Sequence, residues 1–284
     1  MLSIRIKNIV IAVLCLILAV SAFKLPIESV ISTAAKPSVS MPIIMYHHVL
    51  KDKKKLGKYT VSPKEIENDL IYIKQQGYTT VDMEDVIDYV YNKAEFPEKP
   101  IMLTFDDGHY SNYTYVLPLL KKYNCKAVIS IVGEFVDRST EEGELNTSYS
   151  YLSWDLVNEL IGSPYVEIQN HSYGMHDICE RKGCMIMKGE DYEEYTKQME
   201  NDVGKLQEII EEKTGYRPTT FTYPYGFVCV ECNQILKELG FKATLSCYEG
   251  INVLTGKESE LFELKRFNRP SGIDSKKFFS KFEE

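Results

Sequence analysis

Short apolar runs alternate with helical patterns from residue 42 to the end of the chain, and this alternation restricts the fold more than any other feature. The runs that resemble strands lie at residues 42–46, 101–105, 127–131, 166–169, 219–223 and 243–245. Repeated strand and helix units are typical of βα proteins, whose strands form a largely parallel sheet. We therefore predict an α/β fold built as a β/α barrel or an open parallel sheet.

Several of the predicted helices carry their own start and stop signals. Ser62, Pro63 and Glu65 form a capping box that predicts a helix start, and Gly77 predicts its end. The longest predicted helix covers residues 191–214. Its apolar residues recur at helical spacing, which predicts packing against the core and not a binding site; they are Met199, Val203, Leu206 and Ile210.

The N-terminus predicts a segment that enters a membrane. Arg5 and Lys7 precede an uncharged stretch at residues 9–23, which has the length and flanks of a secretory signal. Residues 1–23 are thus interpreted as a cleaved signal peptide or a short uncleaved anchor. Residues 24–41 lack strand or helix periodicity and are interpreted as a linker, followed by a folded domain at residues 42–284. We expect an extracellular domain, either membrane-anchored or secreted.

The overall charge disfavours a broad nucleic-acid interface. The formal net charge is −8, whereas binding many phosphates requires clustered lysine and arginine. The densest basic run, residues 51–55, is interrupted by Asp52 and is interpreted as a solvated loop. We predict no nucleic-acid partner and no protein partner.

Six cysteines lie beyond the linker, at positions 125, 179, 184, 229, 232 and 247. An exported chain permits disulfides. The pairs Cys179/Cys184 and Cys229/Cys232 would also allow a four-thiolate zinc site. The spacing of the first pair is loose for such a site, so we favour disulfides or free thiols, whose connectivity the sequence does not specify.

Polar residues with catalytic potential follow four of the predicted strands. They are His47 and His48, then Asp106, Asp107 and Gly108, then Asn170, His171 and His176, and finally Pro224, Tyr225 and Gly226. Four of the five histidines lie in these places, and the fifth, His109, adjoins the paired aspartates. The carboxyl ends of parallel strands form the active face of a β/α barrel, so we expect these side chains to meet there.

Two imidazoles and one carboxylate are a common ligand set for a catalytic zinc ion, and a second carboxylate beside them can act as a base. Gly108 allows the backbone to turn so that both preceding aspartates face one centre. His171 and His176 are five residues apart, so a loop that contains Gly174 must bring them together. Each motif alone is more often a turn, a cap or a core residue. Their joint occurrence after successive strands favours catalysis.

These residues resemble the polysaccharide deacetylases of carbohydrate esterase family four, whose NodB-type domain is a distorted β/α barrel. The segment Leu103-Thr-Phe-Asp-Asp-Gly108 matches the first family motif residue for residue. The resemblance implies that Asp106 is the catalytic base and that Asp107, His171 and His176 bind a divalent metal, with zinc as the expected ion. The longer spacing between the two histidines is similar to a branch that includes poly-N-acetylglucosamine deacetylases.

The chain also departs from the family pattern. Thr222 stands where the third motif has arginine, so Asp106 is expected to lack its usual orienting partner. The late histidine that serves as general acid is missing, and the resemblance to the same branch implies that His47 replaces it. Strand alternation predicts that His47 enters the site and His48 does not. Tyr225 is expected to provide a backbone N–H for the oxyanion.

The predicted function is a metal-dependent hydrolase that removes N-acetyl groups from an extracellular polysaccharide such as peptidoglycan, poly-N-acetylglucosamine or a chitin-like polymer. The expected partners are this polysaccharide and, through the N-terminal segment, a membrane. Two alternatives remain open: an O-acetyl esterase of xylan type with the same metal site, and a non-catalytic glycan-binding domain of the same fold. The presence of all the implied ligands and the base favours an enzyme.

Overall fold

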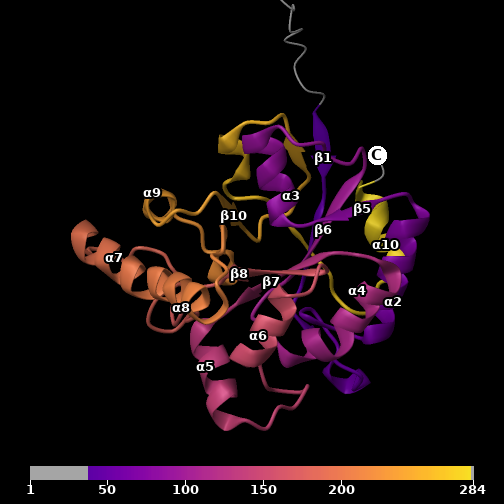
Figure 1. The fold of residues 1–284 in the computed structure, drawn as a ribbon, viewed down its shortest axis with the longest axis horizontal. Coiled ribbons are helices and arrows are strands. Elements are labelled where there is room, and N and C mark those ends of the chain that lie inside the picture. Colours follow the sequence, from indigo (N-terminus) through magenta and orange to yellow (C-terminus); the bar gives the residue numbers. More distant parts are fainter. Residues whose placement is uncertain (1–37, 283–284) are drawn as a thin grey trace, which may run out of the picture. The chain divides into compact units, whose positions relative to one another are not determined.

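The structure, a computed structural model, describes residues 38–282, and Figure 1 shows their arrangement. Its centre is an eight-stranded sheet in which every neighbouring pair is parallel. In order across the sheet, the strands are β10 (Ala243–Leu245), β9 (Thr220–Thr222), β8 (Val166–Asn170), β7 (Ala127–Ile131), β6 (Pro100–Phe105), β2 (Ile43–Tyr46) and β12 (Phe267–Asn268), with β5 (Thr79–Val81) also paired to β6.

The segment before β12 links the two edges of this sheet. Leu264 forms a parallel bridge with Leu245 of β10, while Phe267 pairs with Ile44 of β2. The sheet therefore curls into a half-barrel, which confirms the predicted α/β fold with a parallel sheet. This half-barrel is consistent with the predicted distorted barrel of NodB type.

Every strand predicted from the sequence is present, and β7 and β10 have the predicted bounds. The remaining strands contain only two or three residues, too few to produce a periodic pattern. Besides β5 and β12, they are β1 (Val39–Met41), β3 (His48–Val49), β4 (Thr60–Val61) and β11 (Asn252–Leu254).

Helices surround the curled sheet (Figure 1). They are α2 (Pro63–Gln75), α3 (Met83–Ile87), α4 (Leu117–Tyr123), α5 (Gly133–Glu142), α6 (Trp154–Ile161), α7 (Tyr192–Met199), α8 (Lys205–Thr214), α9 (Val230–Glu238) and α10 (Ser275–Phe279). Helix α2 has the predicted capping box. The predicted long helix is divided into α7 and α8 by a π-helical turn at Glu200–Gly204, and its apolar stripe is fully buried as expected.

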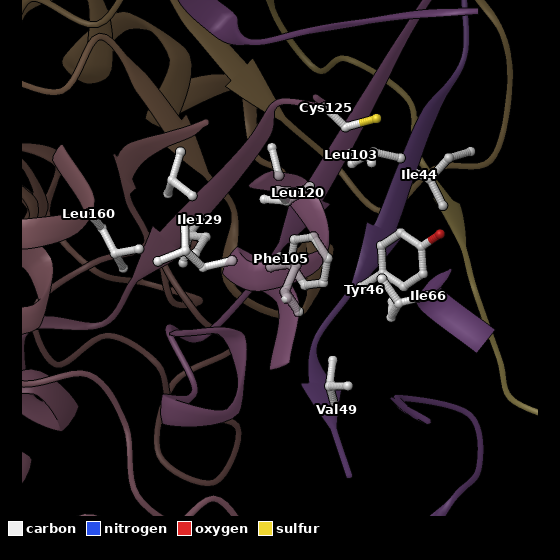
Figure 2. Packing of buried hydrophobic residues seen from close by; sticks show 14 of the residues in the cluster. Ile44, Tyr46, Val49, Ile66, Leu103, Phe105, Leu120, Cys125, Ile129 and Leu160 are labelled. Atoms are coloured by element: carbon white, nitrogen blue, oxygen red, sulfur yellow. The ribbon is translucent and has the colours of Figure 1, made fainter. Parts of the chain in front are cut away.

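Strand alternation builds the core on both faces of the sheet. On β6, Leu103 and Phe105 face the helices, whereas Met102 packs in a separate cluster on the other face. Figure 2 shows the helix side, where Ile66 of α2 and Leu160 of α6 lie in the same cluster as these strand residues. The face of the sheet opposite these helices is therefore available for polar residues at the carboxyl ends of the strands.

The predicted segment at residues 1–23 lies outside the described residues, as does most of the predicted linker at residues 24–41. The end of that linker requires a correction. Residues Val39–Met41 form β1, which pairs antiparallel with β11, and Met41 is fully buried. The partner strand is too distant in sequence to produce a local signal. Within residues 38–282, the structure contains no helix with the length and apolar character that spanning a membrane requires.

The described cysteines include both of the favoured states, a disulfide and free thiols. Cys229 and Cys232 are bonded to each other, and the other four described cysteines are free. The four-thiolate zinc site is therefore not formed.

Candidate active site and metal centre

One cavity of about 560 Å³ at the carboxyl ends of the strands is bordered by every predicted site residue. These residues are His47, Asp106, Asp107, His171, His176 and Tyr225. They come from the ends of β2, β6, β8 and β9 or from the loops that follow these strands. The expectation that these separate strand ends meet is thus confirmed.

Asp107, His171 and His176 form a compact group of possible metal ligands. Asp107 Oδ1 lies 3.5 Å from Nε2 of His171 and 3.2 Å from Nε2 of His176. One ligand atom from each residue lies within 4.8 Å of the other two. A tetrahedral ion with ligands at roughly 2 Å fits between atoms spaced in this way. Asp107 reaches this position through a left-handed backbone conformation, with φ of 70°.

His171 is oriented by a backbone carbonyl. Its Nδ1 lies 2.7 Å from the carbonyl oxygen of Thr222, and the side chain is buried. This contact assigns the proton to Nδ1, so Nε2 can present its lone pair to an ion, as in many metal sites. Thr222 occupies the motif position where the family has arginine, and here its main chain contributes to the site.

His109 supports the opposite side of the Asp107 carboxylate. Its Nε2 lies 3.4 Å from Asp107 Oδ2, while the two ligand histidines approach Oδ1. The ring is stacked between His48, at 4.2 Å, and Tyr151, at 4.9 Å between centroids. From the sequence, His109 is only a neighbour of the paired aspartates. Its position two residues after Asp107 was the only signal for this contact.

These contacts keep Asp107 ionised. Burial alone would raise the pKa of its carboxyl group, but hydrogen bonds with His109, His171 and His176 hold that pKa well below its usual range. An ionised carboxylate is the form that binds a divalent ion.

Asp106 has a buried partner, Arg266, that lies outside every sequence motif. Arg266 Nη1 lies 2.7 Å from Asp106 Oδ1 and Nη2 lies 2.8 Å from Oδ2, with both side chains buried. The expectation that Asp106 lacks an orienting arginine is therefore wrong. Arg266 lies 160 residues away, just before β12, so no motif spacing could identify it. Burial would raise the pKa of Asp106, but the charges of Arg266 and His47, together with the hydrogen bonds from Arg266, lower this pKa below its usual value.

The two adjacent histidines have different surroundings. His47 Nε2 lies 3.9 Å from Asp106 Oδ2, and its buried Nδ1 has no hydrogen-bond partner within residues 38–282. His48 Nε2 lies 2.7 Å from the carbonyl oxygen of Thr147, and burial lowers its pKa to about 4. His47 borders the cavity as predicted, but His48 borders it too, so the expectation that alternation keeps His48 outside the site is wrong.

Tyr225 lies at the rim of the cavity in the turn Pro224–Gly226. Its φ of 56° is unusual for a residue with a side chain. The ring packs against His176 with 4.6 Å between centroids, and 43% of the residue is exposed. This turn brings both the main chain and the ring of Tyr225 beside a candidate metal ligand.

Together, the curled parallel sheet and the carboxylate and histidine cluster at its strand ends define a β/α half-barrel with a candidate metal centre. A family model described as polysaccharide deacetylase matches residues 93–244, more than half of the 284 residues. The chain therefore belongs to the polysaccharide deacetylase family.

Two bacterial relatives are named poly-beta-1,6-N-acetyl-D-glucosamine N-deacetylase. The protein from Escherichia coli K12 is 24% identical over 79% of this chain and 36% of its own length. The protein from Staphylococcus aureus MRSA252 is 22% identical over 71% of this chain and 66% of its own length. The chain thus spans about a third of the first relative and just under two thirds of the second.

Solved structures show the same fold. A de-N-acetylase from Aggregatibacter actinomycetemcomitans has a TM-score of 0.72 and 23% identity, covering 86% of this chain and 98% of that one. IcaB from Ammonifex degensii has a TM-score of 0.68 and 24% identity, covering 82% and 93% respectively.

Proposed function

We propose that this chain is a metal-dependent N-deacetylase that acts on a polysaccharide of the poly-β-1,6-N-acetylglucosamine type. The observation that carries this proposal is the placement of Asp106, paired with Arg266, beside the cluster of Asp107, His171 and His176. The names of the two bacterial relatives support the substrate class.

The chemistry divides among the residues that border the cavity. Asp107, His171 and His176 would hold a divalent ion, which we propose to be zinc. When bound, this ion would supply Lewis acidity toward water and the acetyl carbonyl. Asp106, kept ionised by Arg266, accepts a proton from the attacking water. The backbone N–H of Tyr225 donates to the developing oxyanion.

His47 completes the proposed reaction as the general acid. An amine leaves poorly unless it is protonated, so amide hydrolysis needs a proton donor at this step. The Nε2 atom of His47, 3.9 Å from Asp106 Oδ2, is close enough to serve the same reacting group as the base. This role favours N-acetyl over O-acetyl substrates.

We also propose that the enzyme works outside the cell, anchored or secreted through residues 1–23. The signal-like charge and hydrophobicity pattern of these residues supports this location. Fractionation of cells that produce the full chain, with protease added outside, tests it. Protection of the domain in intact cells would contradict the proposal.

Acetate release from β-1,6-linked N-acetylglucosamine oligomers tests the activity. We expect the purified chain to release acetate, to stop after chelation, and to recover when zinc is added. Asp106→Asn should fold and keep its metal yet lose most turnover, while Asp52→Asn in an exposed loop serves as the matched control. Hydrolysis of acetylated xylan alone would favour an esterase, and glycan binding without acetate release would favour a non-catalytic domain. Either result would contradict the proposal.

A further inference from the structure

The two histidines of the candidate metal centre are joined by a short loop, residues 172–175. These residues lie in no helix or strand, and Ser172 has a left-handed backbone conformation with φ of 74°. A binding group carried by a loop is held less precisely than one carried by a helix or strand, unless other contacts support it. The position of His176 relative to His171 therefore depends on the contacts that hold this loop.

The carboxylate of Asp202 holds the backbone of the loop. Its Oδ1 accepts the backbone N–H of Tyr173 at 2.8 Å, and its Oδ2 accepts that of Gly174 at 2.8 Å. The backbone N–H of Met175 donates to the same carboxylate. Hydrogen bonds to an ionised acceptor are stronger than those between neutral groups. One side chain thus binds three successive N–H groups directly before His176.

A π-helical turn places Asp202 beside the loop. Asp202 belongs to the turn Glu200–Gly204 between α7 and α8, and such turns occur frequently at functional sites. The next residue, Val203, accepts a hydrogen bond at its carbonyl oxygen from Asn170 Nδ2, at 3.0 Å. Asn170 Oδ1 in turn accepts the backbone N–H of Ser172, at 2.9 Å. The whole path from the end of β8 to His176 is therefore attached to this one turn.

The carbonyl groups of the loop are held separately, at the start of α5. The backbone N–H of Gly133 donates to the carbonyl oxygen of Ser172 at 3.1 Å, and that of Glu134 donates to the carbonyl oxygen of Tyr173 at 2.9 Å. Both contacts join backbone atoms, so changing a side chain leaves their donors and acceptors in place. The contacts of Asp202, in contrast, can be removed by one substitution.

We propose that Asp202 is a positioning residue that fixes His176 in its metal-binding position. Asp202 does not border the active-site cavity, so it acts only through the loop. Without its carboxylate, the loop would have more conformations available, and ordering His176 on metal binding would cost conformational entropy. Groups that orient a metal ligand typically contribute 10- to 100-fold to metal affinity. This inference rests on the proposed function and adds a residue to its metal centre.

The test measures the Kd for zinc of the purified full chain, freed of metal and titrated in competition with a chromogenic chelator. Asp202→Ala should raise this Kd about 10- to 100-fold. Asp202→Asn keeps the shape and one acceptor oxygen, so the rise should be smaller. In the metal-free protein, amide hydrogen exchange of residues 172–176 should be faster in Asp202→Ala than in the wild type, because the N–H groups lose their acceptor.

Asp191→Ala is the matched control. The Asp191 carboxylate also accepts two backbone N–H groups, those of Glu193 and Glu194, at 2.9 Å and 3.1 Å. It caps the start of α7 and does not border the cavity. Its loss removes the same kind of contact from the same pair of helices, yet the Kd for zinc and the exchange of residues 172–176 should stay at their wild-type values.

The outcomes separate this inference from the proposed function. If folded Asp202→Ala binds zinc with the wild-type Kd, or if Asp191→Ala raises the Kd equally, Asp202 has no positioning role and the deacetylase proposal stands. If Asp202→Ala does not fold, Asp202→Asn decides, and a wild-type Kd in that variant contradicts the role. If the wild type binds neither zinc nor another divalent ion, the metal centre itself is wrong and both proposals are rejected.

Discussion

Asp106 and Arg266 form a buried ion pair whose two short contacts determine the protonation state of the candidate base. Arg266 also donates from Nη1 to Thr104 Oγ1, at 3.1 Å, and from Nε to the Ser246 carbonyl oxygen, at 2.7 Å. Because the buried guanidinium has this many acceptors, its contacts offset the free-energy cost of removing it from water. The arginine therefore orients the base and keeps its carboxyl group ionised.

Arg266→Met tests this dependence. Without the positive charge, burial remains and the pKa of Asp106 should rise, so the base would become protonated at a higher pH. The acid limb of the kcat/KM profile should move toward higher pH, and the free energy of unfolding should fall by about 3–5 kcal/mol because a buried charge loses its partner. Arg266→Lys keeps the charge and should shift the limb less. An acid limb that stays at the wild-type pH in Arg266→Met would contradict this role.

His47 must carry a proton to act as the acid, and its pKa sets the alkaline limit of activity. Burial lowers this pKa, against the opposing charges of Asp106 and Asp107. The protonated form of His47 is lost as pH rises through its pKa. Amide hydrolysis should therefore decline at a lower pH than it would if the general acid were an exposed histidine. His47→Ala should remove this limb and lower amide turnover by roughly 10²-fold or more.

Substrate choice and His48→Ala provide the controls for His47. The loss in His47→Ala should be greater for amides than for activated esters, because activated esters have leaving groups that need no proton. His48→Ala removes a ring that stacks on His109, but it should not change the ratio of amide to activated-ester activity, since its Nε2 is engaged by the Thr147 carbonyl. Equal losses on both substrates, or a larger effect at His48, would show that the acid lies elsewhere.

Helix α2 is connected to the C-terminal part of the domain by a second buried ion pair. Asp69 of α2 accepts hydrogen bonds from Arg269 Nε, at 2.8 Å, and Nη2, at 3.0 Å. The hydroxyl groups of Tyr46 and Ser275 donate to the same carboxylate, at 2.9 Å and 2.6 Å. One carboxylate thus joins α2, β2 and α10. The role of this network is structural, since none of its four residues borders the active-site cavity.

Asp69→Ala should destabilise the domain because Arg269 would remain buried without its partner. We expect the free energy of unfolding in urea to fall by about 3–5 kcal/mol, with metal binding retained. Glu67→Gln on the same helix is the matched control, since its salt bridges to Lys64 and Lys122 are at the surface and should contribute about 1 kcal/mol or less. Equal losses in the two variants would contradict a specific role for the buried pair.

At the scale of the whole domain, residues far apart in the chain complete the sheet. Strand β1 pairs with β11, and the segment before β12 pairs with the end of β10. The two ends of the described chain therefore contribute to one folded unit. Arg266 lies in this late segment, so completing the half-barrel also completes the candidate active site.

Two truncations test where the folded domain begins. A chain of residues 38–284 keeps β1 and should unfold at the same urea midpoint as the full chain. A chain of residues 43–284 loses β1 and the buried Met41, and its free energy of unfolding should be lower by about 2–5 kcal/mol, the usual effect of emptying one core position. Equal midpoints for the two truncated chains would show that β1 is dispensable.

The positions of the main strands and most of the candidate site could be predicted from the sequence, because the signals are local. Alternation along β6 places Phe105 toward the helices and Asp106 toward the interior. The capping box at Ser62 and the turn at Gly108 need only neighbouring residues to form. For the same reason, His171 and His47 were identified from the strands that precede them.

The tertiary structure alone decided the contacts that join distant segments. Arg266 reaches Asp106 across 160 residues, and the Thr222 carbonyl orients His171. None of these residues belongs to a motif with its partner, and the strands β1 and β12 are too short for periodicity to show. Side-chain chemistry and alternation are properties of neighbouring residues, whereas the partner of a buried charge depends on which strands lie side by side after folding.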